Sequence, residues 1–255
     1  MSGLKARGFT RFVRSPYLLG GVLLLVLWQG FSLIAGARIV PPPIPVLTRF
    51  AELLPGVLWR HALASFARVA LSLLLSTAAA IPVGLAAGRS RRADALLSPL
   101  TYLLYPVPKI ALLPVVMLLF GMGDLSKVIV VSLVLFFQTL VTVRDAAREV
   151  EPQYLVSIRS LGAGRLQVLR YVILPAILPA LFTSVRIGAG TALAVLFFAE
   201  TFATKHGLGY FIMDGWMRIN YLDMFAGIVG IGVLGLALFR LIDLLERRLC
   251  PWKDA

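Results

Sequence analysis

Six long apolar runs, each close to the length of a membrane-spanning helix, constrain this chain more than any other feature. A bilayer core of roughly 30 Å needs about 20 apolar residues in helical form. The runs cover residues 17–36, 66–88, 96–120, 126–143, 177–199 and 224–242. They are far longer than the roughly ten alternating residues of a membrane β-strand. The sequence therefore predicts an all-α membrane protein with about six transmembrane helices.

The composition agrees with a chain that lies in a bilayer. Hydrophobic residues make up 59% of the 255 residues and charged residues 15%, against about 25% charged in an ordinary soluble domain. The single cysteine, Cys250, excludes an internal disulfide. Two histidines, His61 and His206, are too few and too far apart in the sequence for a metal or haem site. We therefore expect no cofactor in this chain.

The third run is the most irregular of the six. It contains Pro106, Pro108 and Pro114, and each proline removes a backbone hydrogen-bond donor. We therefore expect a kinked or tilted helix over residues 96–120.

The distribution of basic residues predicts the orientation. The net charge of +13 would favour nucleic acid in a soluble protein, but in a membrane protein basic residues gather on the cytoplasmic side. With the N-terminus inside, the inner segments hold Lys5, Arg7, Arg11, Arg14, Arg89, Arg91, Arg92, Arg144, Arg148, Arg159, Arg165, Arg170, Arg247, Arg248 and Lys253. The outer segments hold Arg38, Arg49, Arg60, Lys127, Lys205 and Arg218. The first set is more than twice as large, so we expect both termini in the cytoplasm and no nucleic-acid partner.

The first run has a second interpretation, as a cleaved signal peptide. Basic residues precede it, and Ala35-Gly36-Ala37 is similar to a cleavage site. The run is longer than the apolar core of a signal peptide, however, and no soluble domain follows it. The predicted organisation is a cytoplasmic N-terminal segment at 1–16, a transmembrane domain at 17–248 and a cytoplasmic tail at 249–255.

Two polar segments between the runs are long enough to matter. The outer one, 37–65, opens with a polyproline spacer at 41–45 and continues into an apolar pattern that suits a short interfacial helix over 47–63. The inner one, 144–174, has Pro152 near the start and Gly162 just past the end of a helix of about ten residues. A second helical piece then leads into the fifth run. This tight helix-turn-helix is either a docking surface or an amphipathic connector resting on lipid headgroups.

Three motifs in this chain resemble those of binding-protein-dependent ABC importer permeases. Residues 160–175, SLGAGRLQVLRYVILP, are similar to the second half of the cytoplasmic signature loop of that family, whose centre is a glycine. PVPKIALLP at 106–114, followed by FGMG at 120–123, resembles the nitrate, sulfonate and taurine branch, as does Ala199-Glu200 followed by GLG at 207–209. The resemblance covers roughly three quarters of the chain, from Leu63 onward.

The signature loop departs from the family at one place. Alignment on the central glycine puts Val156, Ser157 and Ile158 where the family has Glu-Ala-Ala. The charged contact of the family's glutamate is therefore not expected here. By resemblance, the residues that couple to the ATPase are Val156, Ser157, Ile158, Arg159, Leu161, Gly162, Ala163 and Gly164.

The resemblance implies a type I ABC importer permease fold in the bacterial inner membrane. The chain has no Gly-x-x-x-x-Gly-Lys-[Ser/Thr] phosphate loop, so it is not itself an enzyme, and a partner ATPase would bind ATP and magnesium. An extracytoplasmic solute-binding protein would deliver the solute, and a second copy of the chain would complete the pore. The implied solute is nitrate, a sulfonate, taurine or a similar small anion. A thiamine-precursor or riboflavin-like solute is the alternative.

Three charged residues inside the runs or at the end of one are candidates for the translocation path, because a charge at membrane depth is costly and usually functional. Lys109 lies near the middle of the third run, where it could attract an anion or pair with a backbone carbonyl freed by the prolines. Arg186 is expected to snorkel or to pair at the dimer interface. Glu200 is either a water-exposed helix end or, by the motif, part of a gate.

Two other classes of protein compete with this interpretation. An ion-driven secondary transporter normally shows two related halves, and the first three runs show no repeat in the last three. A membrane enzyme needs acids, histidines or a nucleophile at one depth. Acidic residues within the runs are nearly absent and the histidines fall in different outer loops, so an ATP-driven permease fits best.

Overall fold

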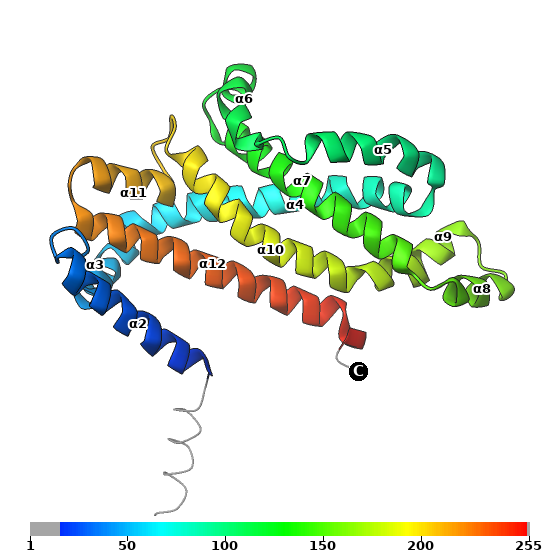
Figure 1. The fold of residues 1–255 in the computed structure, drawn as a ribbon, viewed down its shortest axis with the longest axis horizontal. Helices are drawn as coiled ribbons and strands as arrows, with labels where there is room; N and C mark the ends of the chain where they lie inside the picture. Colours follow the sequence, from blue (N-terminus) through cyan, green and yellow to red (C-terminus); the bar gives the residue numbers. More distant parts are fainter. Residues whose placement is uncertain (1–15, 254–255) are drawn as a thin grey trace, which may run out of the picture. The chain divides into compact units, whose positions relative to one another are not determined.

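The computed structural model describes residues 16–253, and within that range the chain forms helices, turns and loops but no strand (Figure 1). The helices are α2 (Pro16–Ala35), α3 (Pro43–Leu53), η1 (Leu54–Leu58), α4 (Trp59–Arg89), α5 (Arg91–Leu104), η2 (Lys109–Leu112), α6 (Leu113–Phe120), α7 (Asp124–Glu149), α8 (Pro152–Ser160), α9 (Arg165–Val168), η3 (Leu169–Ile173), α10 (Leu174–Glu200), α11 (Leu208–Met217), α12 (Tyr221–Leu249) and η4 (Pro251–Lys253). The predicted N-terminal segment, apart from Pro16, and the last two residues of the predicted tail lie outside the described residues.

The all-α membrane fold is confirmed. Five helical stretches are long and apolar enough to cross a bilayer: Leu18–Ala35, Pro43–Arg89, Asp124–Glu149, Arg165–Glu200 and Tyr221–Leu249. A bent pair, Arg91–Leu104 with Lys109–Phe120, makes a sixth span if it is counted as one. Helices α4, α7 and α12 extend beyond the predicted ends, because polar residues continue each helix past its apolar part.

The kink predicted for the third span is confirmed, and it is a complete break of the helix. Instead of one kinked helix, α5 and the η2–α6 piece are bent by 81°. Pro106 and Pro108 lie in the break and lack the backbone N–H that would continue α5. Pro114 falls in the first turn of α6, where no backbone donor is needed. Two of the three prolines therefore break the span, and the third begins the next helix.

The prediction for residues 37–65 is also wrong in its main element. No separate short helix covers 47–63, because α3 begins at Pro43 and continues through the π-helical turn η1 into α4. Pro43 and Pro45 stand in the first turn of α3, which tolerates proline. Pro55 is accommodated where the wider π turn replaces an α turn.

The described chain divides into two compact units. The first holds residues up to Trp59 together with 211–230. Within it the indole N–H of Trp28 donates to the carbonyl of Pro41 over 3.2 Å, and the Ser32 hydroxyl donates to the carbonyl of Val40 over 2.7 Å. These bonds tie α2 to the turn that precedes α3.

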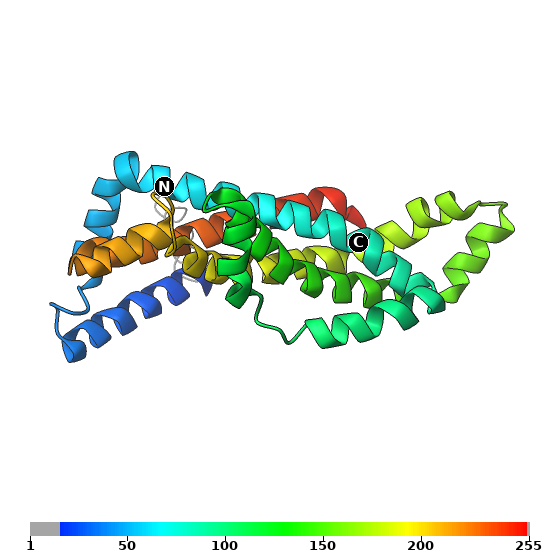
Figure 2. The same cartoon turned by 90° about the horizontal axis from the view of Figure 1, so that it is seen from above.

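The second unit holds Arg60–Tyr210 and residues from Ile231 onward. Here α7 lies along α10 in both ribbon views (Figures 1 and 2). Helix α4 approaches α7 most closely at two glycines. A Cβ on Gly84 would lie 2.8 Å from the Cβ of Val143, and one on Gly88 would lie 2.5 Å from the carbonyl oxygen of Arg144. Close packing of this pair therefore requires glycine.

Candidate functional site

The segment predicted to couple to an ATPase forms a helix-turn-helix. Helix α8 covers Pro152–Ser160, and the chain then turns at Gly162, whose φ of +82° lies in the left-handed region that favours glycine. The predicted proline start and glycine end are confirmed. A Cβ on Gly162 would meet nothing within 4 Å, so the backbone angle, not lack of space, requires glycine here.

The surface of this segment carries exposed apolar side chains among polar ones. Six of the eight predicted coupling residues are exposed: Val156, Ser157, Arg159, Leu161, Gly162 and Gly164. Val156 is 66% exposed and Leu161 is 86% exposed. The other two, Ile158 and Ala163, pack against a buried apolar cluster that includes Leu155. The segment is thus anchored on one side and presents apolar side chains on the other.

Lys109 lies where α5 breaks, and it satisfies backbone groups left by the break. Its Nζ donates to the carbonyl oxygens of Leu104 over 2.7 Å and Tyr105 over 2.6 Å. In a continuous helix, the Leu104 carbonyl would accept from residue 108, which is proline and has no N–H. The ammonium also lies 4.6 Å from the ring centre of Phe137. The structure therefore shows the carbonyl pairing that was one of the two expectations for Lys109.

A pocket of about 430 Å³ opens beside this lysine. Its polar lining consists of Tyr105, Lys109, Gln138 and Thr191. Lys109 itself is buried, so its positive charge lies within the wall of the pocket and is not exposed in the opening.

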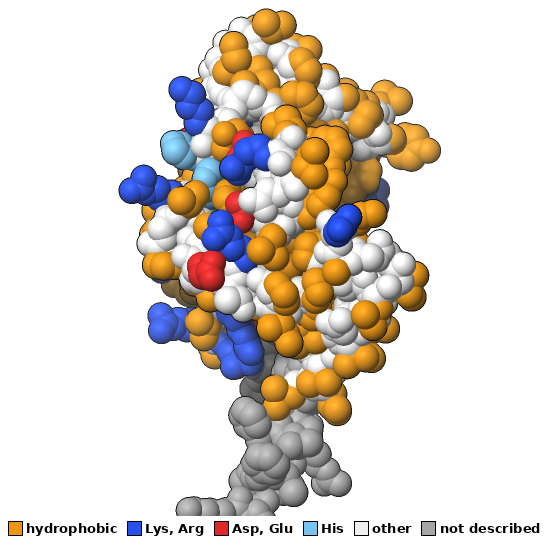
Figure 3. Space-filling view, turned by 90° about the vertical axis from the view of Figure 1, so that its left-hand side faces the viewer, with side chains coloured by type: hydrophobic (Ala, Val, Ile, Leu, Met, Phe, Trp, Pro, Cys, Tyr) orange, Lys and Arg blue, Asp and Glu red, His pale blue; other side chains and the backbone are white. Residues whose placement is uncertain are grey.

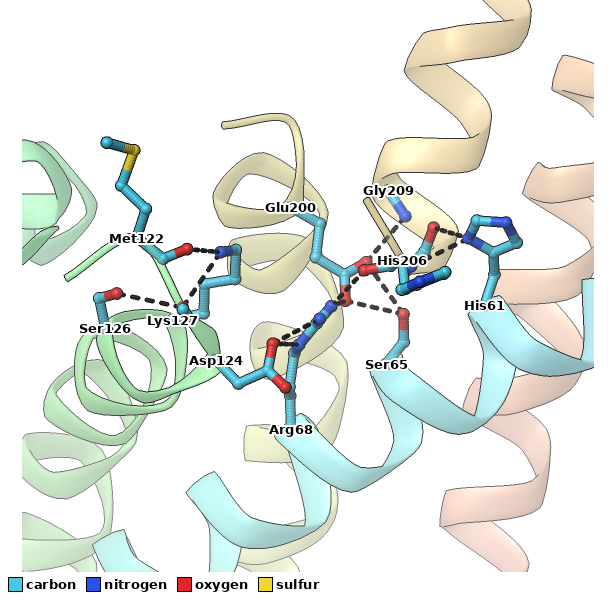
Figure 4. A network of polar contacts seen from close by, with 12 residues as sticks. His61, Ser65, Arg68, Met122, Asp124, Ser126, Lys127, Glu200, His206 and Gly209 are labelled. Carbon is cyan, nitrogen blue, oxygen red and sulfur yellow. Dashed lines mark hydrogen bonds and ion pairs between the residues drawn. The ribbon is translucent and has the colours of Figure 1, made fainter. Parts of the chain in front are cut away.

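The prediction that Glu200 is a water-exposed helix end is wrong. This residue ends α10 as expected, but it is 1% exposed. Its carboxylate accepts from the Ser65 hydroxyl over 2.9 Å, from the backbone N–H of Gly209 over 2.9 Å and from Nη1 of Arg68 over 2.5 Å (Figure 4). The residue therefore joins α4, α10 and the start of α11.

Arg68 is the residue that sequence reasoning missed. Besides Glu200, its guanidinium donates to the carbonyl oxygen of His206 over 2.8 Å and to Oδ1 of Asp124 over 3.0 and 2.6 Å (Figure 4). Arg68 is 6% exposed. The signal was present in the sequence, since Arg68 is a charge inside the second apolar run, the criterion applied to Lys109.

Lys127 was placed among the outer loop charges, and the structure buries it completely in the first turns of α7. Its Nζ donates to the carbonyl oxygens of Met122 and Gly123, both over 3.2 Å (Figure 4). Buried backbone oxygens need donors, and the lysine provides them where the chain turns into α7.

The GLG motif at 207–209 has a steric explanation. Gly207 has a φ of +139°, and a Cβ there would lie 2.5 Å from both carboxylate oxygens of Glu200. A Cβ on Gly209 would lie 2.6 Å from the carbonyl oxygen of Phe197. Only a chain without side chains at these two positions can pass so close to the carboxylate.

The two histidines are closer in space than the sequence suggests. His61 lies in α4, where its Nδ1 accepts from the backbone N–H of Gly207 over 3.0 Å. Its ring centre is 5.8 Å from that of His206. The histidine of α4 therefore helps to hold the segment between α10 and α11.

Arg186 has partners that were not predicted. It pairs with two carboxylates of α12 in the same chain, Asp243 at 2.6 Å and Glu246. Counter-charges for Arg186 thus lie on a helix of the same chain, and a role at the dimer interface stays a prediction. The pairing joins α10 to α12.

The predicted coupling segment and the charged cluster around Arg68 and Glu200 lie at opposite ends of α10. The predicted coupling segment precedes the helix, and the buried residues Ser65, Arg68, Lys127 and Glu200, with the exposed Asp124, lie at its far end (Figures 1 and 4). Helix α10 thus connects the exposed helix-turn-helix to the charged cluster.

Comparison with known proteins shows which class of protein this is. Residues 80–250 match the family described as binding-protein-dependent transport system inner membrane component. The taurine transport system permease protein TauC of Escherichia coli K12 is 34% identical over 238 residues, which is 91% of this chain and 86% of that protein. SsuC of Bacillus subtilis 168, named for aliphatic sulfonates transport, is 32% identical over 254 residues, or 98% of this chain and 92% of that protein.

The fold has a solved counterpart. An inward-facing structure of the MetNI methionine ABC transporter superposes with a TM-score of 0.66 and 21% identity, covering 75% of this chain and 95% of that one. The chain belongs to the family of binding-protein-dependent transport system inner membrane components. It is a multi-pass permease of the ABC importer class, and the type I fold is confirmed.

Proposed function

We propose that this permease carries a small sulfonate-type anion, such as taurine or an alkanesulfonate, across the inner membrane. The observation that carries the proposal is the similarity over almost the whole chain to permeases named for taurine and aliphatic sulfonates. A cationic side chain in the wall of the Lys109 pocket is compatible with an anionic solute.

The energy would come from two cytoplasmic ATPase subunits, which bind ATP and magnesium, and the site of contact would be α8 and the turn after it. Exposed apolar residues on an anchored helix are typical of a protein interface, and Val156 and Leu161 are such residues. Because α8 is fixed to the apolar cluster through Leu155, movement of an ATPase against it would be transmitted to α7 and α10.

The remaining partners follow from the family. An extracytoplasmic solute-binding protein would deliver the solute, and a second copy of this chain would complete the pore. We place α8 and both termini in the cytoplasm on the distribution of basic residues. Glu200 and Arg68 then lie toward the outer face, where they would belong to the outer gate. Lys109 would line the pore between the two ends, and Arg186 would hold α10 against α12.

Uptake by cells tests the solute assignment. A strain without its own taurine and sulfonate permeases would express this chain with an ATPase and a binding protein of a taurine transporter, and labelled taurine would be supplied. We expect uptake that unlabelled ethanesulfonate reduces and that dimethyl sulfone, a neutral relative, does not. Uptake of a labelled pyrimidine in place of taurine would show that the alternative solute class is the right one.

A further inference from the structure

The guanidinium of Arg68 has one edge inside the protein and one edge toward solvent. Nη1 faces the buried carboxylate of Glu200 and the carbonyl of His206. Nε and Nη2 both donate to the same oxygen of Asp124, at 3.0 and 2.6 Å. Asp124 is 71% exposed, whereas Arg68 is 6% exposed. An exposed carboxylate therefore covers the outer edge of a buried cation.

The charges around this edge balance only when Asp124 is counted. Arg68 and Lys127 are buried cations, and Glu200 is the buried anion that faces them. A buried charge without a partner is costly. One anion must therefore stand on the outer edge of Arg68, but it need not be Asp124.

The space in front of that edge suits a small anion. A pocket of about 650 Å³ opens there, and its charged or titratable lining residues are Arg60, Arg68, Asp124, Lys205 and His206. Ligand sites commonly have about 300–1,000 Å³. Arg60 and Lys205 are exposed and add positive charge at the rim. Figure 3 shows basic, acidic and histidine side chains gathered within a surface that is otherwise largely hydrophobic.

We propose that the outer edge of Arg68 is a binding site for the oxyanion group of the solute, and that Asp124 occupies this site as a placeholder until a solute displaces it. The proposal rests on the proposed function, because it requires an anionic solute. A guanidinium edge offers two parallel donors that match two oxygens of a sulfonate. Asp124 uses one oxygen for both donors, so an incoming sulfonate would fit the edge better.

Displacement has a structural consequence. The bond from Arg68 to Asp124 ties α4 to α7, while the bond from Arg68 to Glu200 ties α4 to α10. A solute that takes the place of Asp124 breaks the first tie and leaves the second. Arrival of the anion would thus loosen α7 from α4 at this end and keep α4 and α10 together.

Calorimetric titration of the full-length permease in lipid nanodiscs tests whether Asp124 competes with an anion for the outer edge of Arg68. The probe is ethanesulfonate, and dimethyl sulfone is the neutral control. In Asp124→Asn the competing charge is gone, so the Kd for ethanesulfonate should fall about fivefold, the equivalent of one exposed ion pair. Asp94→Asn is the matched control, because Asp94 pairs with Arg144 over 2.8 Å at the other end of α7. Its Kd should equal that of the unmodified chain.

Three results would overturn the proposal: an unchanged or higher Kd in Asp124→Asn, an equal gain for dimethyl sulfone, or no measurable ethanesulfonate binding to either protein. The Asp124 side chain is exposed, so Asp124→Asn is expected to fold, and its unfolding midpoint without ligand is measured in parallel. Tighter ethanesulfonate binding in Asp124→Asn, combined with no taurine uptake by the complete transporter, would support this site and reject the solute assignment alone.

Discussion

At the scale of single residues, the buried charges have specific partners. Lys109 is held by two carbonyls that a broken helix exposes, Lys127 by two carbonyls at a turn, and Glu200 by three donors from two segments, α4 and the start of α11. Sequence reasoning selected Lys109 and Glu200 because both interrupt apolar runs. It misjudged the surroundings of Glu200 because the covering segment, 201–209, comes from an irregular loop whose path no periodicity describes.

Glu200→Gln tests the buried pairing. The substitution leaves Arg68 and Lys127 short of a counter-charge, and loss of one partner of a buried pair costs about 3 kcal/mol, or roughly 6–12 °C in unfolding midpoint for a chain of this size. Glu52→Gln is the control, because the Glu52 side chain is 57% exposed and pairs with Arg49 at the surface. Thermal unfolding in detergent would contradict the account if both variants melted alike.

Lys109→Gln separates charge from hydrogen bonding. The amide still offers a donor to the carbonyls of Leu104 and Tyr105, so the unfolding midpoint should stay within about 2 °C. Lys109→Met removes the side-chain donor from both carbonyls, but the Leu104 carbonyl keeps the backbone N–H of Val107 over 3.2 Å, so the expected cost is about 1–3 kcal/mol, for the Tyr105 carbonyl alone. If the charge serves an anion in the adjacent pocket, Lys109→Gln should lose most taurine uptake and Lys109→Arg should keep part of it. Normal uptake by Lys109→Gln would make the lysine purely structural.

At the scale of elements, the apolar runs predicted which segments are helical, and proline and glycine decided where the predictions failed. The spacing of Pro152 and Gly162 located α8, because both residues act locally on the backbone. Pro106 and Pro108 signalled a kink, but an angle of 81° depends on how η2 and α6 pack against α7. Long-range packing of this kind leaves no local pattern in the sequence. The close approach of Gly84 and Gly88 to α7 is a second case that no local pattern indicates.

Gly162→Val tests the coupling turn. A β-branched residue in the left-handed region is strained by roughly 1–2 kcal/mol, so the turn after α8 should rearrange. We expect the variant to insert into the membrane but to lose uptake and copurification of the ATPase. Gly30→Ala is the control, since Gly30 lies in α2, outside the coupling segment, and a Cβ there would meet nothing within 4 Å. Normal transport by Gly162→Val would remove this turn from the coupling path.

At the scale of the whole molecule, composition and length were enough to predict a helical membrane protein, and the loop motifs were enough to predict its family. The orientation rests on basic residues, of which Lys127 proved to be a buried charge and not a loop charge. Without Lys127 the inner excess is larger still, so the predicted orientation is unchanged.

Cysteine labelling tests that orientation. Gly56 and Gln153 are exposed, and a membrane-impermeant thiol reagent added to intact cells should label Gly56→Cys and leave Gln153→Cys unlabelled until the membrane is opened. Cys250 is buried, so the native cysteine should give little background in either state. Labelling of Gln153→Cys in intact cells would reverse the topology and place α8 outside.

The central claim is that this chain is the membrane path of an ATP-driven importer, and transport by a defined system tests it most directly. Proteoliposomes would contain the permease and its ATPase, with the binding protein and labelled taurine outside and either ATP or ADP enclosed. The account predicts that taurine accumulates inside only with ATP and only when the binding protein is present. Equal accumulation with ADP, or accumulation driven by a proton or sodium gradient, would contradict it.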